Sequence, residues 1–333
     1  MGPVSEPTRI VRRGRPARRG RLARSAAAFA ALLGLASYVT FHQVTGSRGT
    51  PRCSVGSGEN RYEFTPDQAS NAATISAVGT ARGLPERAVT IALATALQES
   101  ALRNIRHGDR DSLGLFQQRP SMGWGTPAQI MDPVYSAGKF YEGLEKVPGY
   151  SRLPLTVAAQ KVQKSGFPQA YAKHEPDATL LSAALTGRAP AALICTASDV
   201  EGLPPGDPVK VRTELVRAFG EAAAPKVVTG GSSAGRSATE PPVLVVPVRA
   251  TADGGTAPGA GADERRGWEL AQWAVARADE LRVTEVAYGG RVWRASEPSG
   301  GWEKSSPASA GAPSEAGSGA AAEAEPVRIR LAR

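Results

Sequence analysis

The chain has 333 residues, of which 41% are hydrophobic, and this allows two folded domains with real cores but hardly three. Glycine and proline are frequent, at 37 and 26 residues, so much of the chain lies outside any core. The formal net charge is +9, but eight arginines and one glutamate fall in residues 1–24 and leave only +2 for the rest. The positive charge is concentrated in an N-terminal tail, and this location argues against a basic nucleic-acid-binding face on a folded domain. We therefore expect no nucleic acid partner.

The basic tail, residues 1–24, precedes twenty residues without a charge, 25–44 (SAAAFAALLGLASYVTFHQV). This length just spans a bilayer, and arginines on its N-terminal side keep that end in the cytoplasm. A cleaved signal peptide is the alternative, but bulky residues such as Tyr38 and Phe41 stand where a cleavage site needs small ones. We therefore expect a single-pass protein of the cell membrane with its catalytic part extracellular, or a secreted protein if the segment is cleaved.

Residues 45–64 indicate a Gly/Ser-rich linker, and helical patterns follow it. Thr65-Pro66-Asp67-Gln68 is typical of a helix start, with Thr65 as the N-cap and Gln68 completing a capping box. A second helix opens at Pro85, and its apolar residues recur at helical spacing. Glu99 borders this apolar stripe near the end of the helix. Apolar neighbours raise the pKa of a carboxyl, which keeps a glutamic acid protonated and able to donate a proton.

Three motifs follow one another at suitable spacings: Glu99-Ser100, then 114–117 (GLFQ) after a turn-rich loop, then 132–144 with Asp132-Pro133, Ala137-Gly138 and Tyr141. They resemble the motifs of the soluble lytic transglycosylases, with Phe116 where that family usually has Met. The resemblance covers residues 65–195. It implies an all-α lysozyme-like domain that needs no cofactor or metal. It also implies that the binding partner is the glycan strand of peptidoglycan, built from N-acetylglucosamine and N-acetylmuramic acid.

In that family one glutamic acid protonates the glycosidic oxygen and then takes a proton from the primary hydroxyl of the muramic acid, which closes an anhydro ring. The resemblance gives this role to Glu99 and places Ser100, Phe116 and Gln117 at the substrate. The ring of Phe116 either packs on a sugar face or, as its apolar flanks equally indicate, fills the core. A hydrolysing muramidase needs a second carboxylate, for which the 104–111 loop offers Asp109 and Asp111. Charged residues in such a loop, these two and His107 included, are typical of turns.

The chain departs from the family at its Ala-Tyr-Asn-Ala-Gly motif, where residues 158–163 read AAQKVQ. Gln160, Gln163 and Tyr171 are the candidate replacements, and we assign Gln160 and Tyr171 to substrate binding. Trp124 either stacks on sugars or belongs to the core. The missing motif supports a further alternative, a non-catalytic wall-binding protein that has kept the cleft.

Two cysteines, Cys53 and Cys195, stand at the ends of the transglycosylase-like region. In an oxidising compartment one disulfide is the simplest assignment, and two unrelated buried thiols are the alternative. Closing so long a loop contributes about 4–5 kcal/mol in the chain-entropy model. Neither cysteine has a metal-ligand spacing with the three histidines, which argues against a zinc site.

The remaining chain indicates a helix and linker (196–240), a small α+β module (241–304) and a low-complexity tail that ends in an edge strand (305–333). Four of the five tryptophans fall in the module. We expect Trp268, Trp273 and Trp293 in its core, and Trp302 is a candidate for ligand stacking. The predicted fold class is mainly α: a lysozyme-like domain after a single membrane span, plus the α+β module.

Overall fold

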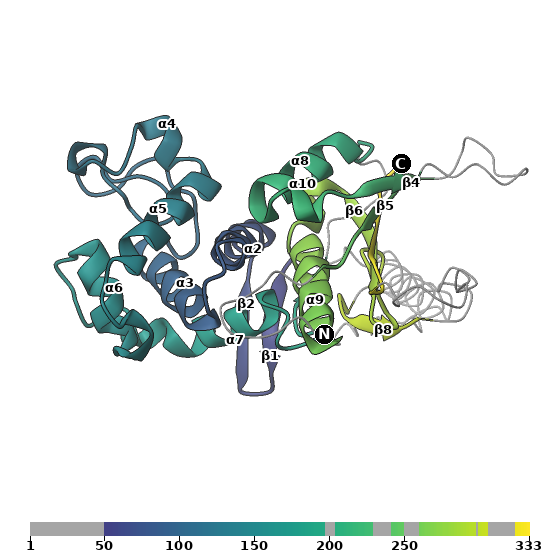
Figure 1. Ribbon diagram of the computed structural model, residues 1–333, viewed down its shortest axis with the longest axis horizontal. Coiled ribbons are helices and arrows are strands. Elements are labelled where there is room, and N and C mark those ends of the chain that lie inside the picture. The colour runs from purple at the N-terminus through teal and green to yellow at the C-terminus, as the bar shows by residue number, and fades with distance from the viewer. Residues whose placement is uncertain (1–49, 197–203, 229–240, 250–259, 298, 306–323) are drawn as a thin grey trace, which may run out of the picture. The chain divides into compact units, whose positions relative to one another are not determined.

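The structure is a computed structural model that describes residues 50–196, 204–228, 241–249, 260–297, 299–305 and 324–333 (Figure 1). The predicted basic tail, 1–24, and the predicted span, 25–44, lie outside the described residues. Residues 50–333 group into one unit by their contacts.

A cluster of helices makes up the first part of this unit. Its helices are α2 (Pro66–Ala81), α3 (Glu86–Ser100), α4 (Pro127–Ile130), α5 (Pro133–Glu145), α6 (Leu155–Gln163) and α7 (Glu175–Leu185). Helix α2 starts as predicted, because Thr65 and Gln68 form both hydrogen bonds of the capping box, at 2.8 and 3.3 Å. It packs against α3 and α5 and also against α8 (Pro208–Phe219) and α9 (Ala260–Ala276), so it lies between the helices of the candidate site and the C-terminal part (Figure 1).

Two antiparallel sheets accompany the helices. The smaller has the order β2-β1-β3, with β1 (Cys53–Ser57), β2 (Asn60–Phe64) and β3 (Ile194–Cys195). The larger has the order β4-β5-β9-β6-β7-β8. Its strands are β4 (Lys226–Val228), β5 (Val243–Val246), β6 (Val283–Tyr288), β7 (Arg291–Arg294), β8 (Trp302–Lys304) and β9 (Val327–Leu331). Helix α9 packs on β6 and β9, and the short α10 (Ala278–Leu281) follows it.

The predicted fold class is wrong, because the described chain combines its helices with two antiparallel sheets, one of them six-stranded. The predicted linker 45–64 contains β1 and β2, and the predicted helix-and-linker segment 196–240 contains β4. Strand β9 was predicted at an edge but lies between β5 and β6. Strands β1, β2 and β4 are short and their period-two pattern is weak, so pairing with distant strands decides their conformation. Strand β9 alternates clearly, but alternation does not show which strands lie beside it.

No helix among the described residues is long and apolar enough to cross a membrane. For the described residues this finding corrects the predicted membrane-spanning fold and the predicted location at the cell membrane; the predicted span itself, 25–44, lies outside them.

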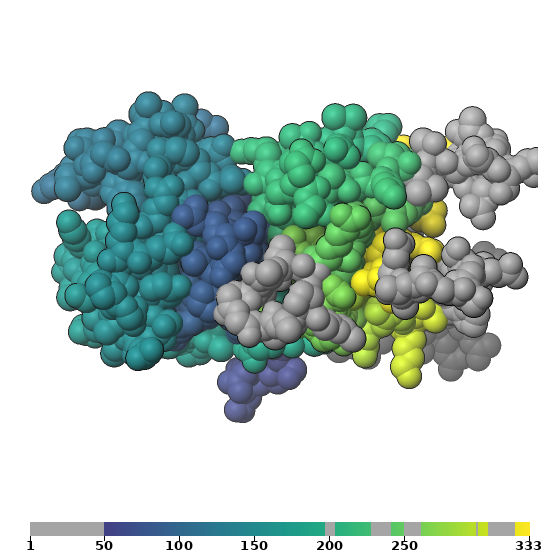
Figure 2. Space-filling model, viewed as in Figure 1, coloured from purple at the N-terminus to yellow at the C-terminus, as the bar shows by residue number. Residues whose placement is uncertain are grey.

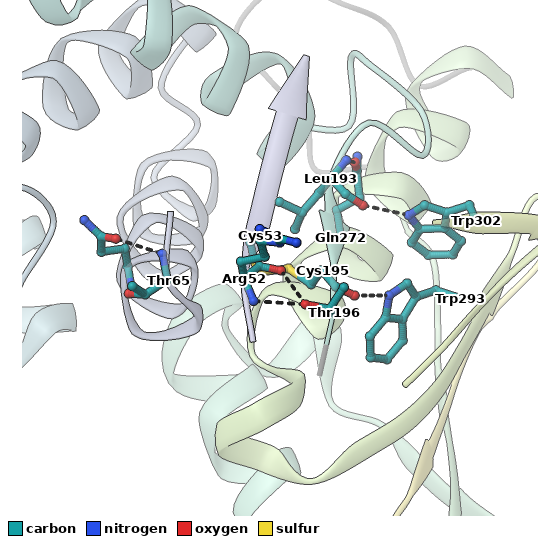
Figure 3. The surroundings of a disulfide bond; sticks show 10 residues. Arg52, Cys53, Thr65, Leu193, Cys195, Thr196, Gln272, Trp293 and Trp302 are labelled. Atoms are coloured by element: carbon teal, nitrogen blue, oxygen red, sulfur yellow. Dashed lines mark hydrogen bonds between the residues drawn. A yellow bond between two sulfur atoms is a disulfide. The ribbon is translucent and has the colours of Figure 1, made fainter. Parts of the chain in front are cut away.

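The predicted disulfide between Cys53 and Cys195 is confirmed. The two cysteines face each other in the β1–β3 pair, and Arg52 and Thr196 extend this pairing with backbone and side-chain hydrogen bonds of 2.8 and 3.0 Å (Figure 3). The bond therefore joins the start of the first sheet to the chain that leaves the helical part.

The C-terminal part holds the strand that carries Cys195. Trp293 Nε1 donates to the Cys195 carbonyl and Trp302 Nε1 to the Leu193 carbonyl, both at 3.0 Å (Figure 3). The fully buried Gln272 accepts from the backbone N–H groups of residues 192 and 193 and donates to the carbonyls of residues 184 and 189.

The tryptophans of the C-terminal part follow the prediction with one correction. Trp268, Trp273 and Trp293 are buried, as predicted for a small core. Trp302 was a candidate for ligand stacking, but its ring packs edge-on against Trp268, with 5.2 Å between the centroids. It is a structural contact of this part of the fold.

Candidate functional site

Glu99 stands in the last turn of α3, and the backbone after it is tightly fixed. Ala101 and Leu102 both adopt left-handed conformations, with φ of 52° and 59°, which end the helix. The Leu102 N–H returns to the Ala96 carbonyl at 3.1 Å, as in a Schellman motif. Side-chain amides of α2 bind the next carbonyls: Gln68 donates to Ala101 at 2.7 Å and Asn71 donates to Leu102 at 2.8 Å. Helix α2 thus holds the end of α3 in place.

The Glu99 carboxyl is largely buried and has a raised pKa. Burial is the main cause, because it disfavours the ionised form. Hydrogen bonds from Tyr171 and Gln163 act in the opposite direction and offset part of the effect. A glutamic acid in this setting holds its proton to a higher pH than an exposed one, as a general acid requires.

Tyr171 determines which oxygen of Glu99 carries the proton. Its hydroxyl donates to Glu99 Oε1 at 2.7 Å. The ring is fully buried, and burial followed by the neighbouring Glu99 raises the pKa of the phenol far above neutral pH, so it remains a donor. Since Oε1 accepts this hydrogen bond, the transferable proton belongs on Oε2.

The turn of residues 114–117 is tied to the same place through its backbone. Ser100 Oγ donates to the Leu115 carbonyl at 2.8 Å, and Gln163 Nε2 donates to the Phe116 carbonyl at 2.7 Å. The Phe116 ring is fully buried and stacks on Phe140, with 4.7 Å between the centroids. Phe116 is therefore a core residue, which is one of the two alternatives that its apolar flanks left open.

Gln117 and Gln160, two further predicted substrate contacts, are engaged elsewhere. The Gln117 amide donates to the Gly114 carbonyl within its own turn at 3.1 Å and lies so close to Gly108 that a Cβ there would meet its Oε1. Gln160 Nε2 donates to the Ser165 carbonyl at 2.8 Å and so closes the turn after α6. Of the predicted substrate-contacting side chains, the structure brings Tyr171 into contact with Glu99.

The two candidate second carboxylates do not contact Glu99. Asp111 accepts from Arg119 Nε at 2.7 Å and from the Ser121 N–H at 2.8 Å, and these bonds hold the pKa of its carboxyl well below its usual range. Asp109 is almost fully exposed, and its side chain approaches Arg110 at 4.0 Å. Asp111 thus fastens the loop before α4 as an ionised group.

Apolar side chains remain at the surface near this site. Phe167 is 76% exposed on the segment between Gln163 and Tyr171, and Met122 is 63% exposed in the loop before α4. Trp124 is half-buried and packs against the core. The outline of the space-filling view is indented between the parts of the surface around α4 and α6 (Figure 2). Exposed rings of this kind suit the apolar faces of sugars.

Among the described residues there is no group of three or more His, Cys, Asp or Glu side chains that could hold a metal ion.

Gln163 is the residue whose importance the sequence understated. It stands three positions after Gln160 in the stretch that replaces the family motif, and one residue before Lys164, whose φ of 52° ends α6. The repeat of glutamine at one-turn spacing was the available signal. This local spacing does not predict the hydrogen bond from Gln163 to the Phe116 carbonyl, because Phe116 lies 47 residues earlier in the chain.

Comparison with known proteins adds one finding. A family model described as "VldE, C-terminal domain" matches residues 252–315, a minor part of the chain that includes α9, α10 and β6 to β8. No curated protein matches the sequence. The match lies outside the segments that carry Glu99, Gln163 and Tyr171.

Proposed function

We propose that the protein is a peptidoglycan lytic transglycosylase that cleaves the bond between N-acetylmuramic acid and N-acetylglucosamine with Glu99 as its single acid and base. The observation that supports this most is the Glu99 carboxyl itself: it is half-buried, its pKa is raised, and the uncharged Tyr171 hydroxyl donates to it at 2.7 Å. The resemblance of residues 65–195 to soluble lytic transglycosylases supplies the substrate class.

The proposed reaction returns Glu99 to its starting state. Protonated Oε2 gives its proton to the glycosidic oxygen, and the bond from C1 of the muramic acid to that oxygen breaks. The carboxylate then takes the proton of the C6 hydroxyl while the C6 oxygen bonds to C1, which closes a 1,6-anhydro ring. Tyr171 stabilises the transient carboxylate by donating a hydrogen bond to its Oε1.

The contacts of Asp111 favour this route over hydrolysis. A retaining or inverting muramidase needs a second carboxylate across the scissile bond from the acid. Asp111 is bound by Arg119 and Ser121, and Asp109 projects into solvent. A substrate whose own hydroxyl is the nucleophile needs neither of them.

The product distinguishes the possible activities. The full chain is incubated with purified peptidoglycan, and the soluble fragments are analysed by mass spectrometry. Anhydro-muramic ends without new reducing ends are expected. Reducing ends would instead indicate a muramidase, and binding without cleavage would indicate the wall-binding protein without activity.

A further inference from the structure

Positive charge gathers next to the candidate site without acidic side chains to balance it. Residues 151–174 include four lysines or arginines and no aspartate or glutamate. The four are exposed and have no ion-pair partner among the described residues: Arg152, Lys161, Lys164 and Lys173. The next acidic side chain along the chain, Glu175, pairs with Arg87 at 2.7 Å. This segment therefore presents positive charge that the protein itself does not neutralise, and such a surface attracts anionic ligands.

Two of these lysines stand next to residues that contact the site. Lys164 directly follows Gln163, which donates a hydrogen bond to the backbone of the turn at the site. Lys173 lies two positions after Tyr171, whose hydroxyl donates to Glu99 at 2.7 Å. The segment between the two lysines leaves the site at one end and returns to it at the other, so both lysines start from backbone close to the acid.

Hydrogen bonds fasten this segment to α6. Gln160 of α6 donates to the Ser165 carbonyl at 2.8 Å, and the Ser165 hydroxyl accepts from the Phe167 N–H at 3.1 Å. The Thr156 hydroxyl, also on α6, donates to the Pro168 carbonyl. The lysines at the two ends of the segment therefore have defined backbone positions beside the site.

The proposed reaction determines which part of the substrate lies beside this surface. The muramic acid whose C1 reacts carries a peptide on the lactyl group at its C3, so the peptide begins a few bonds from the reacting carbon. Such peptides have free carboxylates, and lysine ammonium groups bind carboxylates by charge-assisted hydrogen bonds. An anionic polymer joined to C6 of the same sugar is incompatible with the reaction, because the C6 oxygen must be a free hydroxyl to close the anhydro ring.

We propose that Lys164 and Lys173 bind the carboxylates of the peptide on the reacting muramic acid. The protein then prefers glycan strands that carry peptides over strands without them. This inference rests on the proposed transglycosylase function, because the position of the peptide follows from the reaction at Glu99.

The preference is measured as binding in the inactive Glu99→Gln background, so that cleavage does not change the probe. The probes are soluble glycan strands from peptidoglycan freed of phosphate polymers, in three forms: peptides intact, peptide carboxylates amidated, and peptides removed by an amidase. The intact form should bind at least several-fold more tightly than the other two, and the difference should shrink between about 50 and 500 mM salt, which screens exposed charges. Equal binding of the intact and amidated forms would overturn the proposal.

Two pairs of substitutions then locate the contact. Lys164→Gln with Lys173→Gln should abolish the preference, so that all three forms bind equally weakly. Lys226→Gln with Lys304→Gln is the matched control, because it removes the same charge from exposed lysines on β4 and β8, and it should keep the preference. Loss of the preference in both pairs, or in neither, would contradict the assignment to Lys164 and Lys173. Far-UV circular dichroism verifies folding, and the two single variants serve if the first pair does not fold.

The same measurements separate this inference from the proposed function. If the wild type releases anhydro-muramic fragments but shows no preference for strands with peptides, the peptide contact alone fails. If the wild type does not cleave while the preference depends on the two lysines, the proposed function fails and the contact stands as a property of a wall-binding protein.

Discussion

Burial of the Glu99 carboxyl links its protonation to the stability of the fold. Its pKa is raised in the folded protein by desolvation, so the folded state binds the proton more tightly than the unfolded chain does. The stabilising effect of the bound proton is complete below the unfolded pKa. It is lost as the pH rises through the folded pKa, so at neutral pH the buried carboxylate destabilises the fold. A residue with no role in chemistry would have little reason to remain ionisable here.

Glu99→Gln should therefore stabilise the protein at neutral pH. The amide keeps the shape and still accepts from Tyr171, but it removes the ionisation that the buried site disfavours. The free energy of unfolding in urea is measured for wild type and Glu99→Gln at pH 4 and pH 7.5. It should be larger for the variant at pH 7.5 and nearly equal for the two proteins at pH 4. A variant that is less stable at pH 7.5 would contradict the assignment of burial as the main cause of the raised pKa.

Asp111→Asn should leave cleavage within a few-fold of wild type. The asparagine oxygen still accepts from one of the two donors, Arg119 or Ser121, and in the proposed reaction neither Asp111 nor Asp109 touches the sugar. Initial rates of fragment release from purified peptidoglycan provide the measurement, with Asp109→Asn as the fully exposed comparison. If the rate of cleavage fell a hundred-fold in only one of the two aspartate variants, that aspartate would be the second carboxylate of a muramidase.

For single residues, the sequence predicts which positions belong to the candidate site better than it predicts what their side chains contact. Glu99 next to an apolar stripe was enough to predict its raised pKa, and Tyr171 was chosen as a replacement for a missing motif. For Phe116 the sequence left the cleft and the core as alternatives, because a motif gives the place of a residue without saying whether its side chain or its carbonyl faces the site. The ring is in the core, and the carbonyl binds Gln163. Such a contact between distant segments depends on packing that no local pattern encodes.

At the level of the elements, the end of α3 has an unfavourable backbone conformation that hydrogen bonds from α2 hold in place. Two successive residues other than glycine adopt positive φ directly after Glu99 and Ser100, and two amides from α2 bind their carbonyls. A left-handed conformation costs a non-glycine residue roughly 1–2 kcal/mol. The surrounding contacts maintain this conformation and so fix the direction in which the last turn of α3 points its side chains.

Ala101→Gly should stabilise the protein by about 0.5–1 kcal/mol, because Ala101 is exposed and glycine adopts its φ of 52° without strain. Leu102→Gly relieves the same kind of strain but removes a fully buried side chain, so it should destabilise by about 2–5 kcal/mol. Thermal unfolding of the two variants beside wild type provides the comparison. Equal effects of the two substitutions would contradict this account of the helix end.

Helix starts were predictable from the sequence, whereas the strands largely were not. Thr65, Pro66 and Gln68 specify their helix start through bonds between residues three apart, so a local pattern contains the whole signal. Strand β1 owes its conformation to β2 and to a partner that includes Cys195, 142 residues away. The Gly and Ser residues of that segment pointed to a linker because the partner strand was not visible in the local sequence.

For the whole molecule, the C-terminal part is structurally bound to the part that carries Glu99. Gln272 and Trp302 bind the backbone just before the disulfide-bonded strand and Trp293 binds the carbonyl of Cys195 within it, and α9 and α8 pack on α2. Thr80 and Ser70 of α2 also donate to Glu269 and Glu280. The division into a catalytic domain and a separate module, suggested by composition, does not reflect these contacts.

Gln272→Leu should lower the free energy of unfolding by at least about 3 kcal/mol. Three backbone groups then lose their hydrogen-bond partner among the described residues, while the Ala184 carbonyl keeps the Gly187 N–H, and each buried unpaired group costs about 1–3 kcal/mol. Gln169→Leu, a change of the same type at an exposed position, should stay within about 0.5 kcal/mol of wild type. Urea unfolding of both variants checks the expectation, and similar stabilities would contradict the role given to Gln272.

The disulfide should stabilise the same region independently of these hydrogen bonds. Replacing Cys53 and Cys195 together by serine should cost about 2–5 kcal/mol, as for other native disulfides. Urea unfolding of the double variant under non-reducing conditions measures this cost. If the stability of wild type in reducing buffer does not fall towards that of the double variant, the covalent link is not the cause.

The central claim is that Glu99 alone acts as acid and base, and the rate of the Glu99→Gln variant tests it most directly. Initial rates of fragment release from purified peptidoglycan are compared at equal concentrations of the two proteins, together with their binding to the same material. Removing general acid–base catalysis should lower the rate by at least about 10²–10⁴-fold, while binding stays close to wild type. Cleavage at the wild-type rate by Glu99→Gln would contradict the account.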